Sequence, residues 1–574
     1  MDLNTSRTRR APLRTVDHMV SYLVRAAGVR HMFGVHGANI EDLYDAASGS
    51  GLPISAVIAK HEFAAGTMAD GYHRTGNRIA VVTATSGGGA LNLVAALGEA
   101  YASEVPVLAL VGQPPTALEG RGAFQDQSGV SGSIDCRAVF SPVSRFCERV
   151  GKPEDVAHLL PAALAAAVGS PAGPAVLLLP KDIQQATLST PDWDEPAVTS
   201  RTAGVSGTLR WRLRTGRVVI IAGSGVIRAN ARAELAALAE ALDAGVAVEA
   251  DAKDAFDNHS HRFLGVAGTM GHPSVRRALL AATSCVLAGT RLPHGSRLGL
   301  EDLLATRELV AFHDQPPYVH DERALLVDGD LRANLLATTT MLGGRDTAAP
   351  SEVARGTTER QRAEVDHLPL PERSGDQLGC REVLEVISAV LPVDANVVSD
   401  AGNAGAAVVH FLPTPRRGRQ VLAMGMGGMG FSFGAGLGAA FATGKRTYVL
   451  AGDGSFFMHG MEVHTAVEYH LPVTFVVFNN NAHAMCVTRE DLYYPGVPSH
   501  NRFTPTSIGA GVDAMFPSLA VHTVRARTGL DACRDFLLDA ESRGGPTLVC
   551  VELDTDEIPP FLPFLRHEAV REAS

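Results

Sequence analysis

Cysteine is scarce in this chain: its 574 residues include seven cysteines, an odd number, and they are widely scattered. No two of them form a CxxC pair, and none has the spacing of a metal finger. The pattern therefore argues against a disulfide framework and against a cysteine-ligated zinc site. Reduced thiols in a cytoplasmic protein are the expectation that remains.

The chain also has little net charge and no long apolar run. A formal charge of −11 is mild for this length, and no basic stripe with interleaved aromatic residues indicates a nucleic-acid surface. No uninterrupted apolar run is long enough to span a bilayer. Residues 1–14 are polar and contain arginine but no apolar signal core, so they predict a disordered lead-in. Neither nucleic acid nor a membrane is expected as a partner.

What the chain does have is a regular alternation of helix and strand patterns. Apolar residues make up 46% and charged residues 19%, and the length fits about three domains. Short apolar strands are predicted at residues 31–35, 79–83, 218–222 and 396–399, with helical spacing between strands. The pattern predicts an α/β protein with three doubly wound parallel-sheet domains.

Two stretches that interrupt this pattern mark domain boundaries. Residues 187–208 combine Pro, Asp, Ser and Thr, and residues 343–379 are rich in charge, Thr and Pro, so both are predicted to be linkers. The predicted parts are the lead-in at 1–14, a first domain at 15–186, a linker at 187–208, a second domain at 209–342, a linker at 343–379 and a third domain at 380–574. The first and third domains look alike in the order of their elements.

The stretch with the clearest chemistry lies in the third domain. A predicted strand at 448–451 leads into a Gly-Asp-Gly turn around Asp453, and a strand at 473–478 ends in three asparagines with Asn480 in the middle. Asn480 follows Asp453 by 27 residues, which suits a strand–helix–strand unit, so both should reach the carboxyl edge of one parallel sheet. A carboxylate, an amide oxygen and a nearby backbone carbonyl form the hard-oxygen site with which Mg²⁺ holds a diphosphate. The alternative is a plain turn and a plain loop.

Further motifs lie in the first domain. Glu62 stands at the start of the predicted helix 63–72, where a glutamate usually serves as a capping or dipole partner. Residues 85–92 form a glycine turn at a helix N-terminus, and His36 lies in the turn after the first strand. From residue type alone, each of these motifs can be structural or functional.

Taken together, these stretches resemble the signature of thiamine diphosphate-dependent enzymes. The resemblance extends from about Thr15 to Pro563 and is closest to the acetolactate synthase and benzaldehyde lyase branch of 2-oxoacid decarboxylases and carboligases. It implies that the three domains are, in order, pyrimidine-binding, central and diphosphate-binding. In this family the coenzyme bridges a pyrimidine domain and a diphosphate domain of different subunits, so the resemblance also implies a homodimer or homotetramer.

The resemblance implies a metal site and a coenzyme site. The Mg²⁺ ligands would be Asp453, the side chain of Asn480 and the backbone carbonyl of Ala482, where many relatives have glycine. The Met429 side chain would wedge the coenzyme into its bent shape, and His483 would line the pocket rather than catalyse. The residues implied to bind the coenzyme are Gly402, Asn403, Gly427, Met429, Gly452, Gly454, Ser455 and His483.

The same resemblance implies three catalytic residues. The Glu62 carboxyl, hydrogen-bonded to N1′ of the aminopyrimidine in a dry pocket, would drive the tautomer shift by which the coenzyme takes the proton from its thiazolium carbon. Gln125 would face the substrate, in a segment similar to one that lines the family's pocket. His36 would handle the alkoxide or carbonyl proton while a C–C bond is made or broken. The alternative is a histidine whose ring is satisfied by the backbone of its own loop.

Three departures from acetolactate synthases narrow the expected activity. His36 stands where they usually have proline, and its turn resembles that of benzaldehyde lyase. Arg489 stands where they have the tryptophan that selects 2-oxobutyrate; it can hold an anionic acceptor, pair with Glu490 or stay solvated. Residues 289–297 lack the Asp pair of FAD-binding relatives, and the Gly-Ser-Gly turn at 223–225 is weak evidence for a dinucleotide, so FAD is doubtful.

The predicted function is that of a thiamine diphosphate- and Mg²⁺-dependent carboligase. It would decarboxylate a pyruvate-like 2-oxoacid and add the acyl carbanion to an aldehyde, a ketone or a second 2-oxoacid. The alternatives are acyloin cleavage of the benzaldehyde lyase kind and simple 2-oxoacid decarboxylation. Less favoured are an FAD-dependent oxidase and a homologue without catalytic activity.

Overall fold

The structure is a computed structural model of the chain. It describes residues 13–195, 202–205, 209, 212–213, 216–319, 324–343, 365–369, 375–554, 556–563 and 565–566. The predicted lead-in lies almost wholly outside the described residues, and both predicted linkers lie partly outside them. The chain divides into two compact units, Met1–Val198 with Gly425–Thr443, and Thr199–Met424 with Gly444–Ser574.

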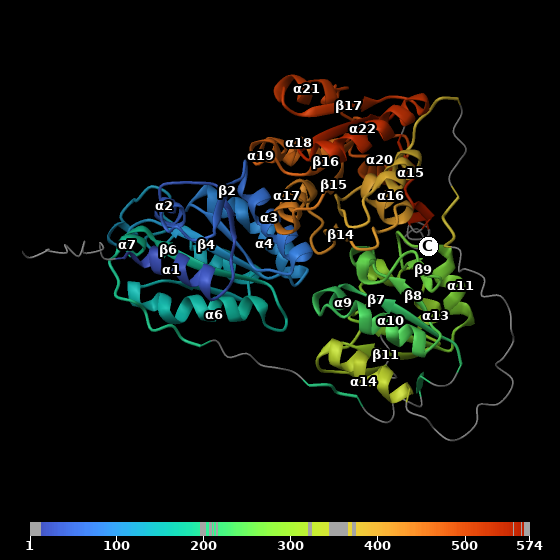
Figure 1. The fold of residues 1–574 in the computed structure, drawn as a ribbon, viewed down its shortest axis with the longest axis horizontal. Coiled ribbons are helices and arrows are strands. Elements are labelled where there is room, and N and C mark those ends of the chain that lie inside the picture. The colour runs from blue at the N-terminus through green and yellow to red at the C-terminus, as the bar shows by residue number, and fades with distance from the viewer. Residues whose placement is uncertain are drawn as a thin grey trace, which may run out of the picture. The chain divides into compact units, whose positions relative to one another are not determined.

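The first unit is built on a six-stranded sheet in the order β2-β1-β3-β4-β6-β5, in which every pairing is parallel. Figure 1 labels β2, β4 and β6 of this sheet. Its strands are β1 (His31–Gly34), β2 (Ser55–Ile58), β3 (Ala80–Ala84), β4 (Val107–Gln113), β5 (Phe146–Arg149) and β6 (Pro174–Pro180). The strands β3, β4 and β6 are buried along their whole length. Continuous apolar strands of this kind are typical of a parallel sheet with helices on both faces.

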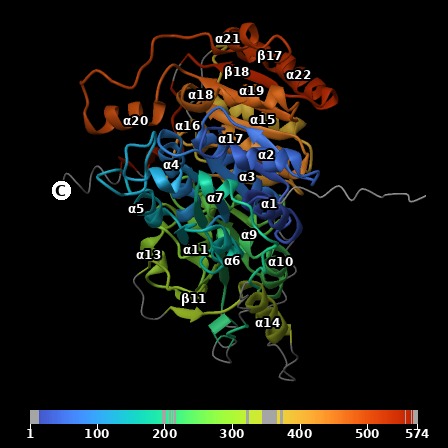
Figure 2. The same cartoon turned by 90° about the vertical axis from the view of Figure 1, so that its left-hand side faces the viewer.

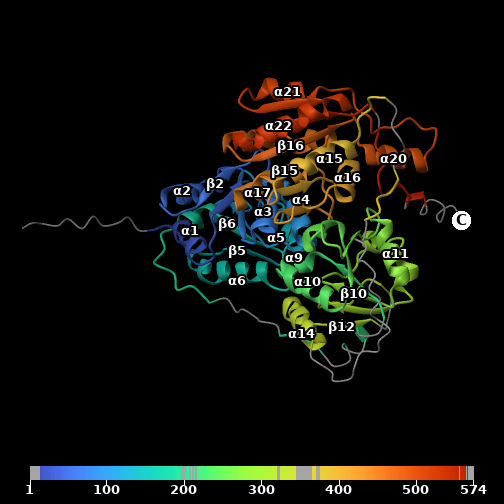
Figure 3. The ribbon, with the colours of Figure 1, turned by 45° about the vertical axis from the view of Figure 1, so that its right-hand side comes forward.

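Helices cover both faces of this first sheet. They are α1 (Thr15–Arg25), α2 (Glu41–Gly49), α3 (Glu62–Gly76), α4 (Gly88–Ala102), α5 (Cys136–Phe140), α6 (Val156–Val168) and α7 (Lys181–Gln185). In Figure 3, α1 and α6 lie side by side, and Leu23 and Leu160 from these helices share one apolar cluster with Leu108 of β4. The helices α3 and α4 contact β1, β3 and β4 but contribute nothing to that cluster, so they cover the other face.

A further helix of the first unit, α17 (Phe431–Thr443), comes from the distant Gly425–Thr443 segment and packs along α3. Small residues permit this close approach. A Cβ atom at Gly71 would lie 2.1 Å from the Ala435 carbonyl oxygen, and one at Gly438 would lie 2.0 Å from the Met68 carbonyl oxygen. The glycines on both helices are therefore a packing requirement.

The second unit contains two more six-stranded parallel sheets, in the orders β12-β11-β10-β7-β8-β9 and β14-β13-β15-β16-β18-β17. The strands of the middle sheet are β7 (Val218–Ala222), β8 (Gly245–Val248), β9 (Phe263–Val266), β10 (Ser284–Ala288), β11 (Glu308–Phe312) and β12 (Leu325–Val327). Those of the third sheet are β13 (Asn396–Ser399), β14 (Arg419–Leu422), β15 (Thr447–Gly452), β16 (Val473–Asn479), β17 (Ala520–Val524) and β18 (Thr547–Glu552).

Helices flank both sheets of this unit. Those that follow the strands of the middle sheet are α9 (Ser224–Arg228), α10 (Arg232–Ala241), α11 (Pro273–Ala281), α12 (His294–Arg297), α13 (Glu301–Leu304) and α14 (Leu331–Gly343). In Figure 2, α10 and α14 lie side by side on one face of the middle sheet, whereas α11 and α13 belong to the apolar cluster of the other face. Those of the third sheet are α15 (Cys380–Val390), α16 (Asn403–Phe411), α18 (Asp453–His459), α19 (Glu462–Glu468), α20 (Ala484–Tyr493), α21 (Ile508–Met515) and α22 (Leu530–Arg543).

The predicted fold class, α/β with three doubly wound parallel sheets, is confirmed. The predicted likeness of the first and third parts is confirmed too, because both sheets have the strand order 2-1-3-4-6-5 when their strands are numbered along the chain. All seven cysteines have free thiols, and six of them are buried. Searched over the described residues, the structure contains no helix with the length and apolar character that crossing a membrane requires.

Candidate functional site

Glu62 is the first residue of α3, and 7% of it is exposed. The helix N-terminus is capped by His61, whose Nδ1 accepts a hydrogen bond from the Phe63 N–H at 3.1 Å. The Glu62 carboxyl instead accepts a hydrogen bond at Oε2 from Asn92 Nδ2 of α4, at 3.0 Å. The side-chain cap of this helix is thus a histidine, and the glutamate carboxyl is held by a different helix.

The glycine turn before α4 fits closely around this carboxyl. A Cβ atom at Gly89 would lie 2.8 Å from Glu62 Oε1, so glycine lets the start of α4 approach the acid. Gly87 has φ +75° and donates its N–H to Gln127 Oε1 at 2.9 Å. The side chain of Gln125 lies against Gly87, where an added Cβ atom would be 2.7 Å from Gln125 Cγ. Glu62 and Gln125 therefore lie at the same end of α4.

His36 lies in the exposed turn that follows β1. Its ring packs on Tyr44, with 4.9 Å between ring centroids. The turn that contains His36 is hydrogen-bonded to the glycine turn before α4, because Asn39 Nδ2 donates to Ser86 Oγ at 2.7 Å. Within the described part of the chain, no hydrogen bond from the backbone satisfies the His36 ring, which does not support the alternative of a backbone-satisfied histidine.

The glycine-dense segment before α17 is held through its backbone. The N–H groups of Gly425, Met426 and Gly427 all donate to the carboxylate of Glu99 on α4, at 3.1, 2.5 and 3.2 Å. Gly427 has φ +66° and open space around the position of an added Cβ atom, and Met429 is half-buried. Gly427 and Met429, the predicted coenzyme contacts, thus lie on a segment whose backbone is hydrogen-bonded to Glu99 of α4.

In the second unit, Asp453 opens α18 directly after β15, and 1% of it is exposed. Gly452 pairs with Phe478 in the parallel β15–β16 ladder, which brings the two strand ends side by side as the spacing predicted. Asp453 Oδ1 accepts from the Gly454 N–H at 2.8 Å, and Oδ2 accepts from the Ala482 N–H at 3.1 Å. Burial raises the pKa of Asp453 to about 6, although the backbone hydrogen bonds act in the opposite direction.

The oxygens around Asp453 fit a divalent cation. Asn480 Nδ2 donates to Asp556 Oδ1 at 2.8 Å, so its amide oxygen is the end that remains for a ligand. Ala482 forms an antiparallel bridge with Arg502, and its N–H donates to Asp453 Oδ2. A buried carboxylate whose hydrogen bonds come from backbone N–H groups is suited to a cation, and carboxylate, amide and carbonyl oxygens are the ligands of hard ions such as Mg²⁺.

Two helix N-termini lie beside this carboxylate. Gly402, with φ +102°, precedes α16, and Ser455 in the first turn of α18 donates its hydroxyl to Asp400 Oδ1 at 2.7 Å. The buried Asn403 donates to the Glu557 carbonyl at 3.3 Å, while its own Oδ1 has no hydrogen-bond partner among the residues that the structure describes. Backbone N–H groups at helix N-termini attract anions, so residues 402–403 and 452–455 could hold a diphosphate.

Two other predicted features have structural partners. Glu490 accepts from Asn501 Nδ2 at 2.6 Å, and the guanidinium of the exposed Arg489 lies 5.1 Å from the Tyr493 ring centroid. Of the three alternatives left open for Arg489, the ion pair with Glu490 is therefore not formed. His483 packs edge-on against Phe503, with 4.7 Å between ring centroids.

The Gly-Ser-Gly turn of the middle sheet serves chain packing. The Gly225 N–H donates to the Gly289 carbonyl at 2.9 Å, and an added Cβ atom at Gly225 would lie 2.7 Å from that oxygen. The turn after β7 and the turn after β10 thus close on each other, and the amide that a phosphate would need already has a partner. This is the plain strand–helix packing that the sequence left open as an alternative.

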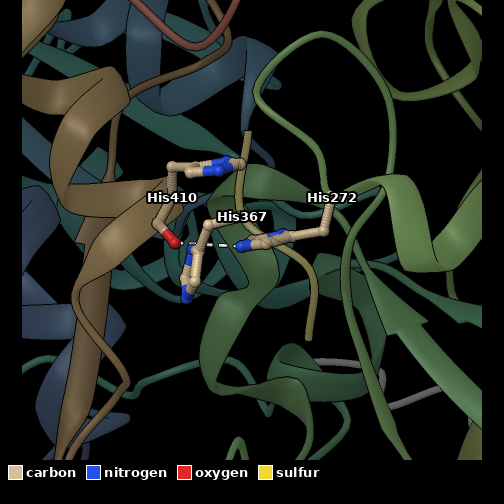
Figure 4. Close-up of side chains that lie close together, drawn as sticks. All are labelled: His272, His367 and His410. Atoms are coloured by element: carbon tan, nitrogen blue, oxygen red, sulfur yellow. Dashed lines mark hydrogen bonds between the residues drawn. The ribbon is translucent and has the colours of Figure 1, made fainter. Parts of the chain in front are cut away.

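A histidine cluster in the second unit, with His272 and His410 buried and His367 exposed, had no counterpart among the predicted sites. The side chains of His272, His367 and His410 approach one another, and the His272 and His410 rings stack with 4.2 Å between centroids (Figure 4). His272 Nδ1 accepts from the Val266 N–H at 2.9 Å, and its Nε2 lies 2.9 Å from the His410 carbonyl oxygen.

The hydrogen bonds of this cluster exclude a metal site in its present arrangement. His410 Nε2 accepts from the Leu368 N–H at 3.0 Å, and Nδ1 lies 3.2 Å from the Met270 carbonyl oxygen. Both rings therefore use all their nitrogens as neutral imidazoles, and a metal ion needs a free nitrogen lone pair. Burial is the largest cause that lowers the pKa of His410 to about 4 and that of His272 well below its ordinary value.

The site contains side chains that sequence reasoning did not single out for their roles: Asn92, Glu99, Gln127 and Asp556. Each is separated from its hydrogen-bond partner by dozens or hundreds of residues, so no local spacing in the sequence predicts these hydrogen bonds. The one available signal for Glu99 was its charge, because it is the single charged residue in the mostly apolar sequence of α4.

Comparisons with known proteins cover most of the chain. Models of thiamine pyrophosphate enzymes match in three parts: the N-terminal TPP binding domain at residues 14–131, the central domain at 213–335 and the C-terminal TPP binding domain at 400–551. A probable acetolactate synthase large subunit of Methanocaldococcus jannaschii is 28% identical over 573 residues, which cover 94% of this chain and 92% of that protein. The acetolactate synthase isozyme 3 large subunit of Escherichia coli is 28% identical over 484 residues, which cover 82% and 83%.

A solved structure shares the fold. Benzoylformate decarboxylase from Polynucleobacter necessarius superposes with a TM-score of 0.78 at 20% identity, covering 95% of this chain and 100% of that one. At this identity the likeness concerns the three-sheet architecture alone.

Proposed function

Because the chain belongs to the thiamine pyrophosphate enzymes, in the acetolactate synthase-like branch, we propose that it is an Mg²⁺-dependent carboligase. Its donor is a pyruvate-like 2-oxoacid, which loses CO₂, and its acceptor is an aldehyde, a ketone or a second 2-oxoacid. The observation that carries this proposal is the buried Glu62 carboxyl, held from the side by Asn92 at the end of α4 where Gln125 also lies.

When bound, thiamine diphosphate supplies an acidic thiazolium carbon that stabilises the carbanion left by decarboxylation. The Glu62 carboxyl would be the group that holds or gives up a proton toward N1′ of the aminopyrimidine. Its exposure of 7% keeps water from competing for the carboxyl, and the Asn92 hydrogen bond fixes its orientation while leaving Oε1 available. Gly89 is needed because any larger residue would displace that oxygen.

The metal ligands in this proposal are Asp453, Asn480 Oδ1 and the carbonyl of Ala482. Asp453 supplies negative charge, and its two backbone hydrogen bonds fix the direction in which the carboxylate faces. Asp556 orients Asn480 by accepting from its amide nitrogen. The N-termini of α16 and α18, at Gly402–Asn403 and Gly452–Ser455, then bind the diphosphate, and His483 lines the pocket.

His36 and Gln125 are proposed to act on the substrate. Both lie on turns at the carboxyl edge of the first sheet, where ligands of α/β proteins bind. The exposed His36 ring can donate and accept a proton near neutral pH, as the carbonyl of the acceptor becomes a hydroxyl. An amide at Gln125 can hydrogen-bond a carboxylate or carbonyl oxygen without changing its own charge.

Subunit composition and location belong to the proposal too. We propose a homodimer or homotetramer in the cytoplasm, with the pyrimidine-binding part at 15–186, the central part at 209–342 and the diphosphate-binding part at 380–574. Sedimentation of the pure protein would measure the oligomeric state, and a monomer at micromolar concentration would contradict this part.

Product analysis tests the proposed reaction. The pure enzyme with thiamine diphosphate and Mg²⁺ is incubated with single 2-oxoacids, then with each 2-oxoacid paired with an aldehyde or second oxoacid, and products are identified by mass. A mass equal to donor plus acceptor minus CO₂ supports ligation. Aldehyde alone would establish simple decarboxylation, and release of aldehydes from an added acyloin would establish cleavage, the direction that the His36 turn favours among the alternatives.

A further inference from the structure

We infer that Glu99 is a positioning residue for the coenzyme: from α4 it anchors the glycine-dense segment Gly425–Gly430 and so sets where the aminopyrimidine is gripped. The inference rests on the proposed function, because a thiamine diphosphate enzyme of this family is expected to bind its coenzyme through Gly427 and Met429 of this segment. It adds a residue with no other assigned role, placed 326 residues before the segment it holds.

The contact is a carboxylate held in a row of backbone N–H groups. Gly425 donates to Glu99 Oε1 at 3.1 Å, and Met426 and Gly427 donate to Oε2 at 2.5 and 3.2 Å. Three consecutive N–H groups that converge on one anion form a nest, and hydrogen bonds to an ionised acceptor are stronger than neutral ones. The carboxylate therefore fixes three successive peptide groups and not merely one residue.

Glu99 is built to stay ionised in this place. It is 2% exposed, and Ser103 Oγ donates to Oε1 at 2.7 Å. Burial raises the pKa of the Glu99 carboxyl. The Arg74 guanidinium, 3.4 Å away, and the Met426 N–H lower this pKa by more than burial raises it, so it lies below its ordinary value. Arg74 in turn binds Asp70 on its own helix at 2.6 Å.

Arg74, which pairs with Glu99, also contacts Phe431, the first residue after the segment. The Arg74 guanidinium lies 5.6 Å from the ring centroid of Phe431, where α17 begins. The segment is thus held by Glu99 at its start and by the Arg74–Phe431 contact at its end. Between them, Gly427 and Gly430 have φ of +66° and +82°, conformations that need an external support to be the single populated state.

The fit at Gly425 shows how closely the segment is seated on α4. A Cβ atom at this position would lie 2.8 Å from Ala102 Cβ and 2.9 Å from Ser103 Oγ. Side-chain packing cannot replace the anchor, since Met426 is 66% exposed. The carboxylate is therefore the contact that decides the path of the chain here.

One face of α4 carries both the contact with Glu62 and the contact with residues 425–427. Asn92, which holds the Glu62 carboxyl, and Glu99 are seven residues apart, close to two helical turns, so they project from the same face about 10 Å apart. Within this chain, the helix therefore sets the distance between the Glu62 carboxyl and residues 425–427.

The test compares Glu99→Gln with Glu154→Gln, a matched change at an exposed acid of the same unit. Hydrogen exchange of the peptide covering residues 423–431 is measured by mass spectrometry in the coenzyme-free protein. Thiamine diphosphate affinity with Mg²⁺ is then measured by calorimetry.

Glutamine at position 99 has the same size as glutamate but is a weaker hydrogen-bond acceptor, and its NH₂ group faces other donors. Exchange in 425–427 should accelerate at least tenfold, and coenzyme affinity should fall about tenfold, with neither change in the control.

Each result decides one claim. Unchanged exchange of residues 423–431 in Glu99→Gln overturns the anchor. Faster exchange with unchanged coenzyme affinity shows a structural contact and overturns the positioning role. If Glu99→Gln does not fold, Ser103→Ala, which removes one donor to Oε1, should give a two- to threefold acceleration in the same peptide, and no change overturns the inference. Failure of the wild-type protein to bind thiamine diphosphate would instead count against the proposed function.

Discussion

The first and third sheets have the same strand order, yet they carry different chemistry at their carboxyl ends. In the first sheet the buried acid, Glu62, follows the second strand, and its carboxyl is held by a side-chain amide. In the third sheet the buried acid, Asp453, follows the third strand, and its carboxylate receives backbone N–H groups. One arrangement suits a carboxyl group that exchanges a proton, and the other suits a carboxylate that binds a cation.

The segments that follow the second strand of each sheet also differ in chemistry although they occupy equivalent positions. In the first sheet this segment delivers Glu62 to the start of α3, and in the third sheet it is the glycine-dense run before α17. A shared topology therefore fixed where side chains gather, while the residue at each strand end fixed what they can do.

The largest effect is expected for Glu62→Gln, which removes the ionisable carboxyl but keeps its size. Turnover should fall about 1,000-fold, the middle of the range for loss of a positioned acid–base group. Coenzyme affinity should stay within about threefold, because no metal or diphosphate contact is lost. Steady-state kinetics and calorimetry measure the two quantities, with Glu154→Gln as control. Unchanged turnover would refute the role of Glu62 and with it the contrast between the two acids.

Asp453→Ala should give the converse pattern. Loss of the one charged metal ligand should weaken Mg²⁺-dependent coenzyme binding at least about 100-fold, since the remaining ligands are neutral oxygens. Calorimetric titration at saturating Mg²⁺ measures this. Asp531→Ala, at an acid on the surface of α22 in the same unit, is the control. Normal coenzyme binding by Asp453→Ala would show that the metal site lies elsewhere.

A smaller effect is expected for Gly89→Ala. The new methyl group would lie 2.8 Å from Glu62 Oε1, and the flexible carboxyl can move away at little cost in stability. Turnover should fall about tenfold, which is the effect of misplacing rather than removing the acid, while the melting temperature stays nearly constant. Gly88→Ala is the matched control, because an added Cβ atom there meets nothing within 4 Å. Equal turnover in the two variants would show that the orientation of Glu62 is unimportant.

The smallest effect concerns acid stability. The folded-state pKa values of His272 and His410 lie below 6.5, to about 4 for His410, so between these values the unfolded state binds more protons and the stability of the fold falls as the pH falls. Each histidine contributes up to about 1.4 kcal/mol per pH unit in this window.

The two units should differ in this respect. Among the described residues, the first unit has one histidine of lowered pKa, His31, whose pKa burial lowers to about 4, whereas the cluster beside α16 in the second unit has three, His272, His367 and His410. Hydrogen exchange at pH 6.5 and 5.0, corrected for intrinsic rates, should show a greater loss of protection in α16 than in α3. Equal losses of protection in α16 and α3 would contradict the prediction that the histidine cluster makes the second unit more sensitive to acid.

Much of the fold could be predicted from local pattern. The strands expected at 218–222 and 396–399 have those bounds in the structure, and the helix expected from residue 63 begins one residue earlier, at Glu62. The proximity of Asp453 and the asparagine run could be predicted as well, because strand–helix–strand connections place successive strand ends next to each other. The boundaries of the predicted domains and the roles of the site residues stay predictions.

The sequence by itself determined the three parallel sheets, the turns that end their strands and the acids at those turns. Apolar periodicity and glycine positions act over windows of about 10 to 30 residues, so they are visible in the sequence alone. Only the tertiary structure decided that Asn92 holds Glu62, that Glu99 holds residues 425–427 and that His272 and His410 stack as neutral rings. These contacts join residues 30 to more than 300 positions apart. They depend on how whole helices pack, which no local window contains.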